Sequence, residues 1–128
     1  MKTIVLIVFL IFAPLKVSAW NAENVESIKD YIVYVASKEG VNVQDALAVA
    51  SCESRFNKDA TRIAENNPDR TSDDEHSVGI FQINLLAHTY ITEEQARNPF
   101  LNINFAIDHL AKGHWGMWKW CSEKHGII

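Results

Sequence analysis

The chain has 128 residues, of which 48% are hydrophobic and 22% are charged, and it carries a formal net charge of −4 at pH 7. This length suits one compact domain with a single core and excludes a second domain. The acidic balance, without a run of Lys or Arg that could neutralise phosphates, argues against nucleic acid as a partner.

The first nineteen residues have the pattern of a signal peptide. Lys2 precedes the apolar run from Ile4 to Leu15, and the small residues at Val17 and Ala19 suit cleavage before Trp20. The run is shorter than the roughly 20 residues of a membrane span; a retained N-terminal anchor is the alternative. We therefore expect a signal peptide at 1–19 and an exported domain at 20–128, in a periplasm or outside the cell, with no stable membrane insertion. Loss of two lysines with this segment changes the formal charge from −4 to −6.

Two helices are predicted at the start of the mature domain. Apolar residues recur at spacings of three and four, at Val25, Ile28, Ile32 and Val35. This amphipathic helix should end at Gly40. Asn42 and Asp45 can cap a second helix. One face of that helix carries Ala46, Val49, Ala50 and Glu53. Glu53 therefore ends an otherwise apolar stripe.

The middle of the chain predicts a long loop followed by a short strand. From Asn57 to Ser77 the sequence is polar and has no helical or strand period, which indicates a surface loop. The stretch SVGIFQIN, from Ser77 to Asn84, partly alternates and suits a strand. Gly79 within it would allow something to approach the backbone closely.

The last third of the chain predicts further helix. Thr92 and Gln95 can start a short helical turn. Asn98-Pro99 begins a longer helix that should end at Gly113. The tail HWGMWKWC then places three tryptophans before Cys121. The architecture is mostly helical, with a small β element.

The two cysteines, Cys52 and Cys121, allow one intramolecular pairing. Because thiols of exported proteins are generally oxidised, we expect a disulfide that fastens the tail beside Glu53. In the chain-entropy account a loop of this length contributes roughly 4 kcal/mol of stability. A thiol enzyme built on Cys52 is disfavoured for the same reason.

Glu53 is the candidate catalytic residue. A carboxyl group at the end of an apolar stripe is costly to ionise, so its pKa should be raised, which suits a general acid near neutral pH. The alternative is that Glu53 is merely the first exposed residue after a buried segment.

Three blocks resemble soluble lytic transglycosylase (SLT)-type domains of the lysozyme-like superfamily. They are Glu53-Ser54-Arg55-Phe56-Asn57, then Ser77 to Asn84, then Asn98-Pro99 with Asn102-Ile103. The resemblance covers nearly the whole mature chain and implies a mainly α (α+β lysozyme-like) fold. It also implies cleavage of the β-1,4 bond between N-acetylmuramic acid and N-acetylglucosamine in peptidoglycan, with Glu53 as the acid and without a cofactor.

The resemblance also implies which residues contact the glycan. The strand block would line the sugar groove, with Gly79 permitting close approach and amides offered to sugar hydroxyl and acetamido groups. The expected substrate-binding residues are Ser77, Gly79, Phe81, Gln82, Asn84, His109 and Trp115. His109 takes the place of a tyrosine found in many such domains, and a surface or structural histidine is an equal alternative. Trp115 is the expected groove-facing ring, although core packing is the commoner use of tryptophan.

The second carboxylate is the main departure from related glycosidases. Animal-type lysozymes with a similar block place an aspartate where this chain has Ser77, which cannot serve as a second carboxylate. Lytic transglycosylases likewise lack it, because their glutamate returns as the base toward the muramoyl C6 hydroxyl. This favours transglycosylase chemistry. An inverting hydrolase that uses Glu75, Asp74 or Asp73 stays open, as does a merely solvated acidic loop.

Metals and partners are less well specified. The acids at 73–75 and nearby histidines invite a metal, but consecutive loop acids are usually solvated, so we expect none. We expect a monomer that acts on peptidoglycan glycan strands. Its acidic charge gives no attraction to an anionic wall, which favours delivery by a secretion or conjugation apparatus. The rival hypothesis is a non-catalytic peptidoglycan-binding accessory protein of such a system.

Overall fold

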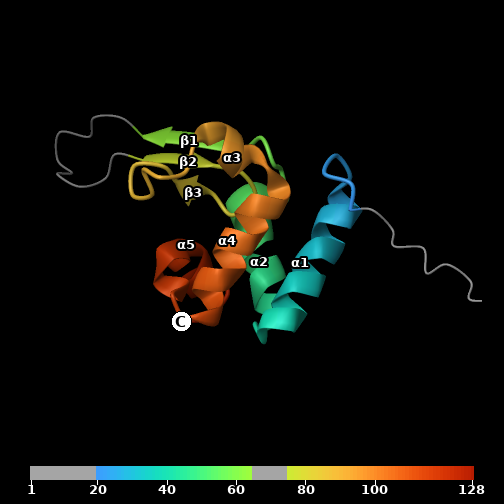
Figure 1. Ribbon diagram of the computed structural model, residues 1–128. Coiled ribbons are helices and arrows are strands. Elements are labelled where there is room, and N and C mark those ends of the chain that lie inside the picture. The colour runs from blue at the N-terminus through green and yellow to red at the C-terminus, as the bar shows by residue number, and fades with distance from the viewer. Residues whose placement is uncertain (1–19, 65–74) are drawn as a thin grey trace, which may run out of the picture.

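The computed structural model describes residues 20–64 and 75–128, and it shows a helical body beside a small antiparallel sheet (Figure 1). The proposed signal peptide, Asp73 and Asp74 lie outside the described residues. Within the described ranges, no helix is both long and apolar enough to cross a lipid bilayer. The mainly helical fold with a small β element and one disulfide, expected from the sequence, is confirmed.

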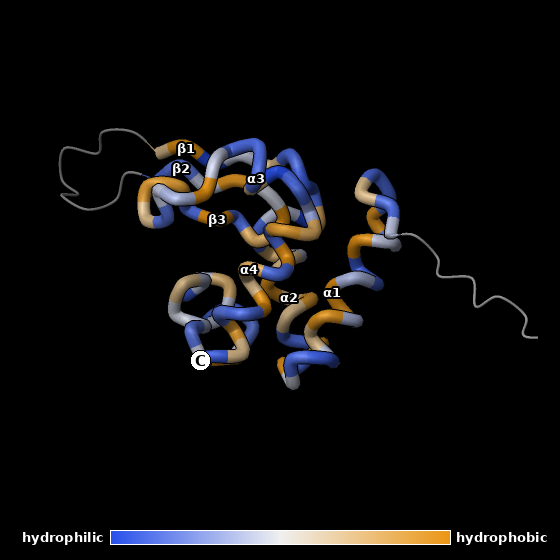
Figure 2. The backbone as a smooth tube through the Cα atoms, viewed as in Figure 1, coloured by the Kyte–Doolittle hydropathy of each residue, from blue (hydrophilic) through white to orange (hydrophobic). Residues whose placement is uncertain are grey.

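Helix α1 (Val25–Glu39) ends before Gly40, and helix α2 (Val43–Ser54) begins after Asn42, as predicted. Asn24 accepts hydrogen bonds from the first turn of α1, and Gly40 ends that helix with φ of 70°. Asn42 caps α2 by accepting from the Asp45 amide. Helix α1 buries Ile28, Ile32 and Val35 but leaves Val25, at its first turn, exposed. Residues along α1, α2 and α4 alternate between apolar and polar in Figure 2, as amphipathic helices require.

The sheet corrects two expectations. Its strands, in the order β1-β2-β3, are β1 (Thr61–Ala64), β2 (Glu75–Val78) and β3 (Ile83–Asn84). The predicted loop at 57–77 therefore contains β1 and most of β2. The predicted single strand at 77–84 is two strands joined by a tight turn, because the backbone at Gly79 and Gln82 has positive φ. Ile80 and Phe81 are buried in this turn rather than alternating between two faces.

Helices α3 and α4 follow the predicted caps, and the tail adds helical structure that was not predicted. Helix α3 (Glu93–Arg97) begins with a capping box formed by Thr92 and Gln95, and α4 (Pro99–Ala111) is capped by Asn98. After Gly113 the chain forms a 3₁₀ turn, η1 (Trp115–Trp118), and the short helix α5 (Lys119–Lys124). The disulfide between Cys52 and Cys121 joins α5 to the end of α2, with the two Cα atoms 5.9 Å apart.

Two hydrophobic clusters hold the molecule together. The larger one unites α1, α2 and α4 with the turn after β2 and with Trp118 and Cys121 from the tail. The smaller one lies between the sheet and α3 and includes Val78, Ile83 and Ala96. Because Ile80 and Phe81 insert into the larger cluster, the sheet is anchored to the helices at the turn that carries the family block.

Candidate active site

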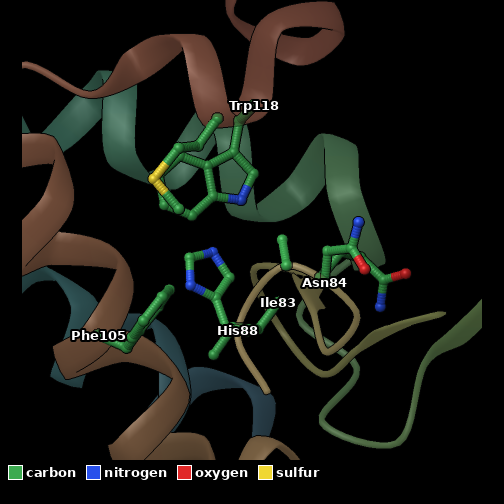
Figure 3. A pocket seen from close by; sticks show the side chains of 8 residues that line it. Ile83, Asn84, His88, Phe105 and Trp118 are labelled. Carbon is green, nitrogen blue, oxygen red and sulfur yellow. The ribbon is translucent and has the colours of Figure 1, made fainter. Parts of the chain in front are cut away.

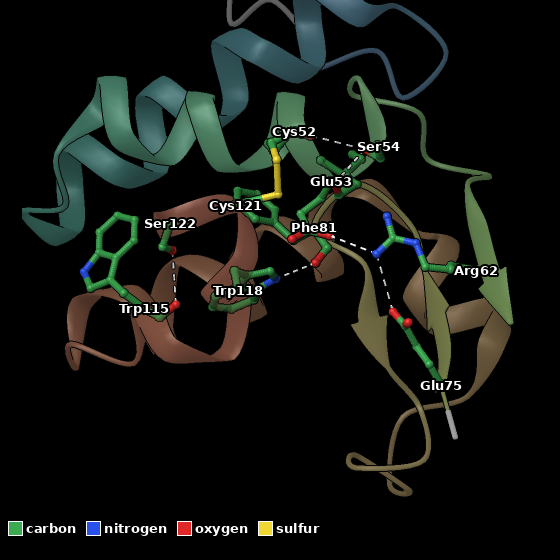
Figure 4. The surroundings of a disulfide bond; sticks show 12 residues. Cys52, Glu53, Ser54, Arg62, Glu75, Phe81, Trp115, Trp118, Cys121 and Ser122 are labelled. Atoms are coloured by element: carbon green, nitrogen blue, oxygen red, sulfur yellow. Dashed lines mark hydrogen bonds and ion pairs between the residues drawn. A yellow bond between two sulfur atoms is a disulfide. The ribbon is translucent and has the colours of Figure 1, made fainter. Parts of the chain in front are cut away.

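Glu53 lies in the last turn of α2, beside two anchors (Figure 4). Its neighbour Cys52 is bonded to Cys121, and its other neighbour, Ser54, donates a hydrogen bond of 2.6 Å to the carbonyl oxygen of Ile80. The first anchor holds the helix end to the tail and the second holds it to the sheet. The Glu53 side chain is 9% exposed. The carboxyl group is thus shielded but not sealed from a ligand.

The surroundings of Glu53 favour its protonated form. Burial raises the pKa of the Glu53 carboxyl from its ordinary 4.5 to about 7. The positive charge of Arg62 opposes this rise in the pKa, and the negative charge of Glu75 adds to it. A carboxyl group that titrates near neutral pH can both give and take a proton there, as a general acid and base must.

Arg62 and Glu75 face Glu53 from the sheet. Arg62 Nη1 lies 3.8 Å from Glu53 Oε2 and 3.6 Å from Glu75 Oε1 (Figure 4). The Ser77 hydroxyl donates a hydrogen bond of 2.7 Å to the same Glu75 oxygen. Glu53 Oε2 and Glu75 Oε1 therefore flank the same guanidinium nitrogen from two sides of the site.

The strand register explains this arrangement and extends it toward a pocket. Arg62 lies opposite Ser77, and Ser77 lies opposite Asn84. Side chains directly opposite each other share one face of a sheet, as do residues two apart along a strand. Arg62, Glu75, Ser77 and Asn84 therefore occupy the face that meets Glu53. Asn84 continues this row to the wall of a pocket.

The pocket lies between β3, the following loop, α4 and the tail, and its volume is about 180 Å³ (Figure 3). Eight residues line it, namely Gln82, Ile83, Asn84, Ala87, His88, Phe105, Met117 and Trp118. Its walls combine aromatic and aliphatic surfaces with a few polar groups, a composition that suits a partly apolar ligand such as an N-acetylated sugar.

Several residues of the predicted block support the site from behind. Phe81 is fully buried and does not line the pocket. Gln82 lines it, but its side-chain nitrogen donates to the carbonyl oxygens of Ala60 and Gly79. Ser77 is buried, and its hydroxyl group donates a hydrogen bond to the Glu75 carboxylate. Of the predicted amides, Asn84 is the one best placed to meet a sugar.

Gly79 is approached closely by the protein itself. A Cβ atom at this position would collide with the Ala96 carbonyl oxygen and the Asn102 side chain. The buried Asn102 side chain accepts a hydrogen bond of 2.8 Å from the Phe81 amide and donates to the carbonyl oxygens of Val78 and Ala96. Because Gly79 has no side chain, the Asn102 side chain can lie against its backbone and fix the turn through these hydrogen bonds.

His109 and Trp115 lie outside the pocket lining. His109 packs against Phe105, which does line it, with the two rings tilted by 54°, and its Nδ1 is 3.0 Å from Nδ1 of His114. Burial, then the neighbouring His114 and His88, lower the pKa of the His109 imidazole. Trp115 is half-buried against the larger hydrophobic cluster. In the described part of the chain, no three His, Cys, Asp or Glu side chains are grouped to hold a metal ion.

The sequence analysis missed three residues that shape the site. Arg62 stands in the segment assigned to a loop, and recognising β1 would have placed it opposite Ser77. Asn102 belongs to a family block, and its signal was a polar residue on the buried face of an apolar helix. Trp118 is the tryptophan that lines the pocket, and only the fold distinguishes it from Trp115.

A mainly helical body with a small antiparallel sheet, and a shielded glutamate at a helix end that faces this sheet, is typical of a lysozyme-like domain. The transglycosylase SLT domain family matches the chain over residues 30–119, and the chain belongs to this family. Membership places it among peptidoglycan lytic transglycosylase-type proteins. No match was found among curated proteins or among solved structures.

Proposed function

We propose that this protein is an exported lytic transglycosylase that cleaves the β-1,4 bond between N-acetylmuramic acid and N-acetylglucosamine in peptidoglycan. The observation that carries the proposal is the shielded carboxyl group of Glu53, whose pKa of about 7 suits transfer of a proton in both directions. Family membership supports the substrate class.

Glu53 acts twice in this reaction. Its protonated carboxyl group gives a proton to the glycosidic oxygen as the bond from that oxygen to muramoyl C1 breaks. The C6 hydroxyl of the same muramoyl residue then attacks C1, and its proton passes to the Glu53 carboxylate. The product carries a 1,6-anhydro ring, no water is consumed, and Glu53 returns to its protonated state.

The pocket beside β3 would receive an acetamido group of the glycan. Its methyl group suits the apolar surfaces of Trp118 and Phe105, and its amide suits the polar groups of Asn84 and His88. Asn84 Oδ1 accepts from the Leu86 amide, which orients its side chain. His109 would act indirectly, by supporting Phe105.

The second candidate is an inverting hydrolase with Glu75 as the base toward water. It is favoured by one observation, that Glu75 and Glu53 contact the same guanidinium group of Arg62. The transglycosylase is preferred because the Arg62 guanidinium and the Ser77 hydroxyl both engage Glu75 Oε1, and a base toward water would have to give up such a contact.

Mass spectrometry of the muropeptides released from purified peptidoglycan tests this proposal, with Glu53→Gln in parallel. Products ending in 1,6-anhydromuramic acid, absent with the variant, are expected. Reducing ends with one added water would indicate the hydrolase. Binding to pelleted peptidoglycan without release of fragments by either protein would indicate an accessory protein.

We further propose that the protein is a monomer delivered locally by a secretion or conjugation apparatus, because its acidic charge gives no long-range attraction to the wall.

A further inference from the structure

Arg62 occupies an unusual place for an exposed side chain. It comes from the edge strand β1 and is 51% exposed, yet its guanidinium group lies between the shielded acid Glu53 and the second carboxylate, Glu75. Cross-strand pairing with Ser77 fixes the direction of its side chain. The Arg62 side chain therefore extends across the face of the sheet toward the two carboxyl groups that could donate or accept a proton, those of Glu53 and Glu75.

Glu75 is the more constrained partner. Its Oε1 contacts the Arg62 guanidinium at 3.6 Å and accepts the Ser77 hydroxyl at 2.7 Å. Both contacts fall on the same oxygen, so Oε1 is held against the face of the sheet. Both partners come from the sheet itself, so they draw Oε1 to its surface and compete with a water for this oxygen.

We infer that Arg62 is a positioning residue that holds Glu75 away from the role of a base toward water and thereby directs cleavage to the anhydro product. This inference rests on the proposed function. It adds to that function by naming the side chain that selects between the anhydro product and the hydrolysed product.

The two outcomes differ in what attacks C1 after Glu53 has protonated the leaving oxygen. In the intramolecular route the C6 oxygen forms the new bond and its proton returns to Glu53. In the hydrolytic route a water oxygen forms the bond, its proton passes to Glu75, and Glu53 is left ionised until both groups re-equilibrate with solvent. A Glu75 released from Arg62 opens the second route.

The experiment measures the fraction of product ends that carry added water, which is independent of the overall rate. Arg62→Gln should raise this fraction about fivefold over the wild type, a change within reach of one ion pair. Arg62→Lys, which keeps the charge, should stay near the wild type, and the double variant Arg62→Gln with Glu75→Gln should return to it. Arg55→Gln is the matched control, since Arg55 is exposed and contacts neither carboxylate.

The possible results distinguish a failure of this inference from a failure of the proposed function. A wild type that releases anhydro ends, with an unchanged hydrated fraction in Arg62→Gln, overturns the inference and leaves the transglycosylase standing. A hydrated fraction that stays high in the double variant also overturns it, because Glu75 is then not the base. A wild type that releases mainly hydrated ends overturns the proposed function itself. Thermal unfolding of each variant verifies that the fold is intact.

Discussion

Trp118 donates a hydrogen bond of 2.6 Å from its indole nitrogen to the carbonyl oxygen of Phe81, and so joins the tail to the turn between β2 and β3. Asn102 holds the amide of the same Phe81 from the side of α4. The turn that carries the family block is therefore fixed by two side chains from distant parts of the chain.

Trp118→Phe tests the first of these contacts. The phenyl ring retains most of the apolar packing but loses the donor, so the buried Phe81 carbonyl oxygen is left without this partner. We expect the free energy of unfolding to fall by about 1–3 kcal/mol. Urea denaturation measures it, and Trp120→Phe, at an exposed position on α5, should change it little.

Asn102→Ala should be more damaging. It removes three hydrogen bonds from a fully buried site, those to the Phe81 amide and to the carbonyl oxygens of Val78 and Ala96. The expected loss is about 3 kcal/mol or more. Asn104→Ala, the same change at an exposed position of the same helix, is the control and should cost about 1 kcal/mol or less. Equal losses for the two variants would refute the structural role of Asn102.

Glu53→Gln should stabilise the protein at alkaline pH. The folded pKa of about 7 exceeds the ordinary 4.5, so the folded state binds more protons than the unfolded state between these values. This contribution of Glu53 to stability is present below about pH 4.5 and is lost as the pH rises through about 7. Relative to the wild type, the variant should gain about 1–3 kcal/mol at pH 8, less than the full shift implies because water still reaches the carboxyl group. The change at pH 5 should be smaller.

Chemical denaturation at the two pH values measures this difference. Glu39→Gln, at an exposed position at the end of α1, serves as the control. A Glu53→Gln variant whose advantage over the wild type is the same at both pH values would show that Glu53 titrates normally.

The pH dependence of cleavage should report the same carboxyl group. Activity should fall as the pH rises through about 7, because Glu53 must be protonated to act as the acid. Arg62 lowers the pKa of Glu53, so Arg62→Gln should move this fall to higher pH. Glu75 raises the pKa, so Glu75→Gln should move it to lower pH. Rates of muropeptide release across a pH series measure both, and shifts in the opposite sense would contradict the assignment.

The helices were predictable because their signals are local. Asn42, Thr92 and Asn98 are caps readable from a few neighbouring residues, and the apolar spacing of α1 extends over about three turns. Strand β1 has four exposed residues and β3 has only two, so neither shows a period-two pattern. Pairing between strands distant in sequence, rather than local preference, forms this sheet.

The acid of the candidate site was predictable, and most of its surroundings were not. Glu53 ends an apolar helical stripe, a pattern visible in one segment. Arg62 reaches it only through strand pairing, and Trp118 lines the pocket only because the tail folds back against the turn. Trp115 and His109 were chosen by proximity in sequence and by analogy, which do not specify the direction of a side chain.

The bond between Cys52 and Cys121 joins the residue before the acid to the segment that supplies the pocket tryptophan. Such a bond persists in oxidising compartments and is reduced where glutathione and thioredoxin act. A chain still inside the cell that makes it would lack this brace between the two walls of the site. Formation of this brace therefore depends on the redox state of the compartment, and in a reducing one only non-covalent contacts would join the tail to the end of α2.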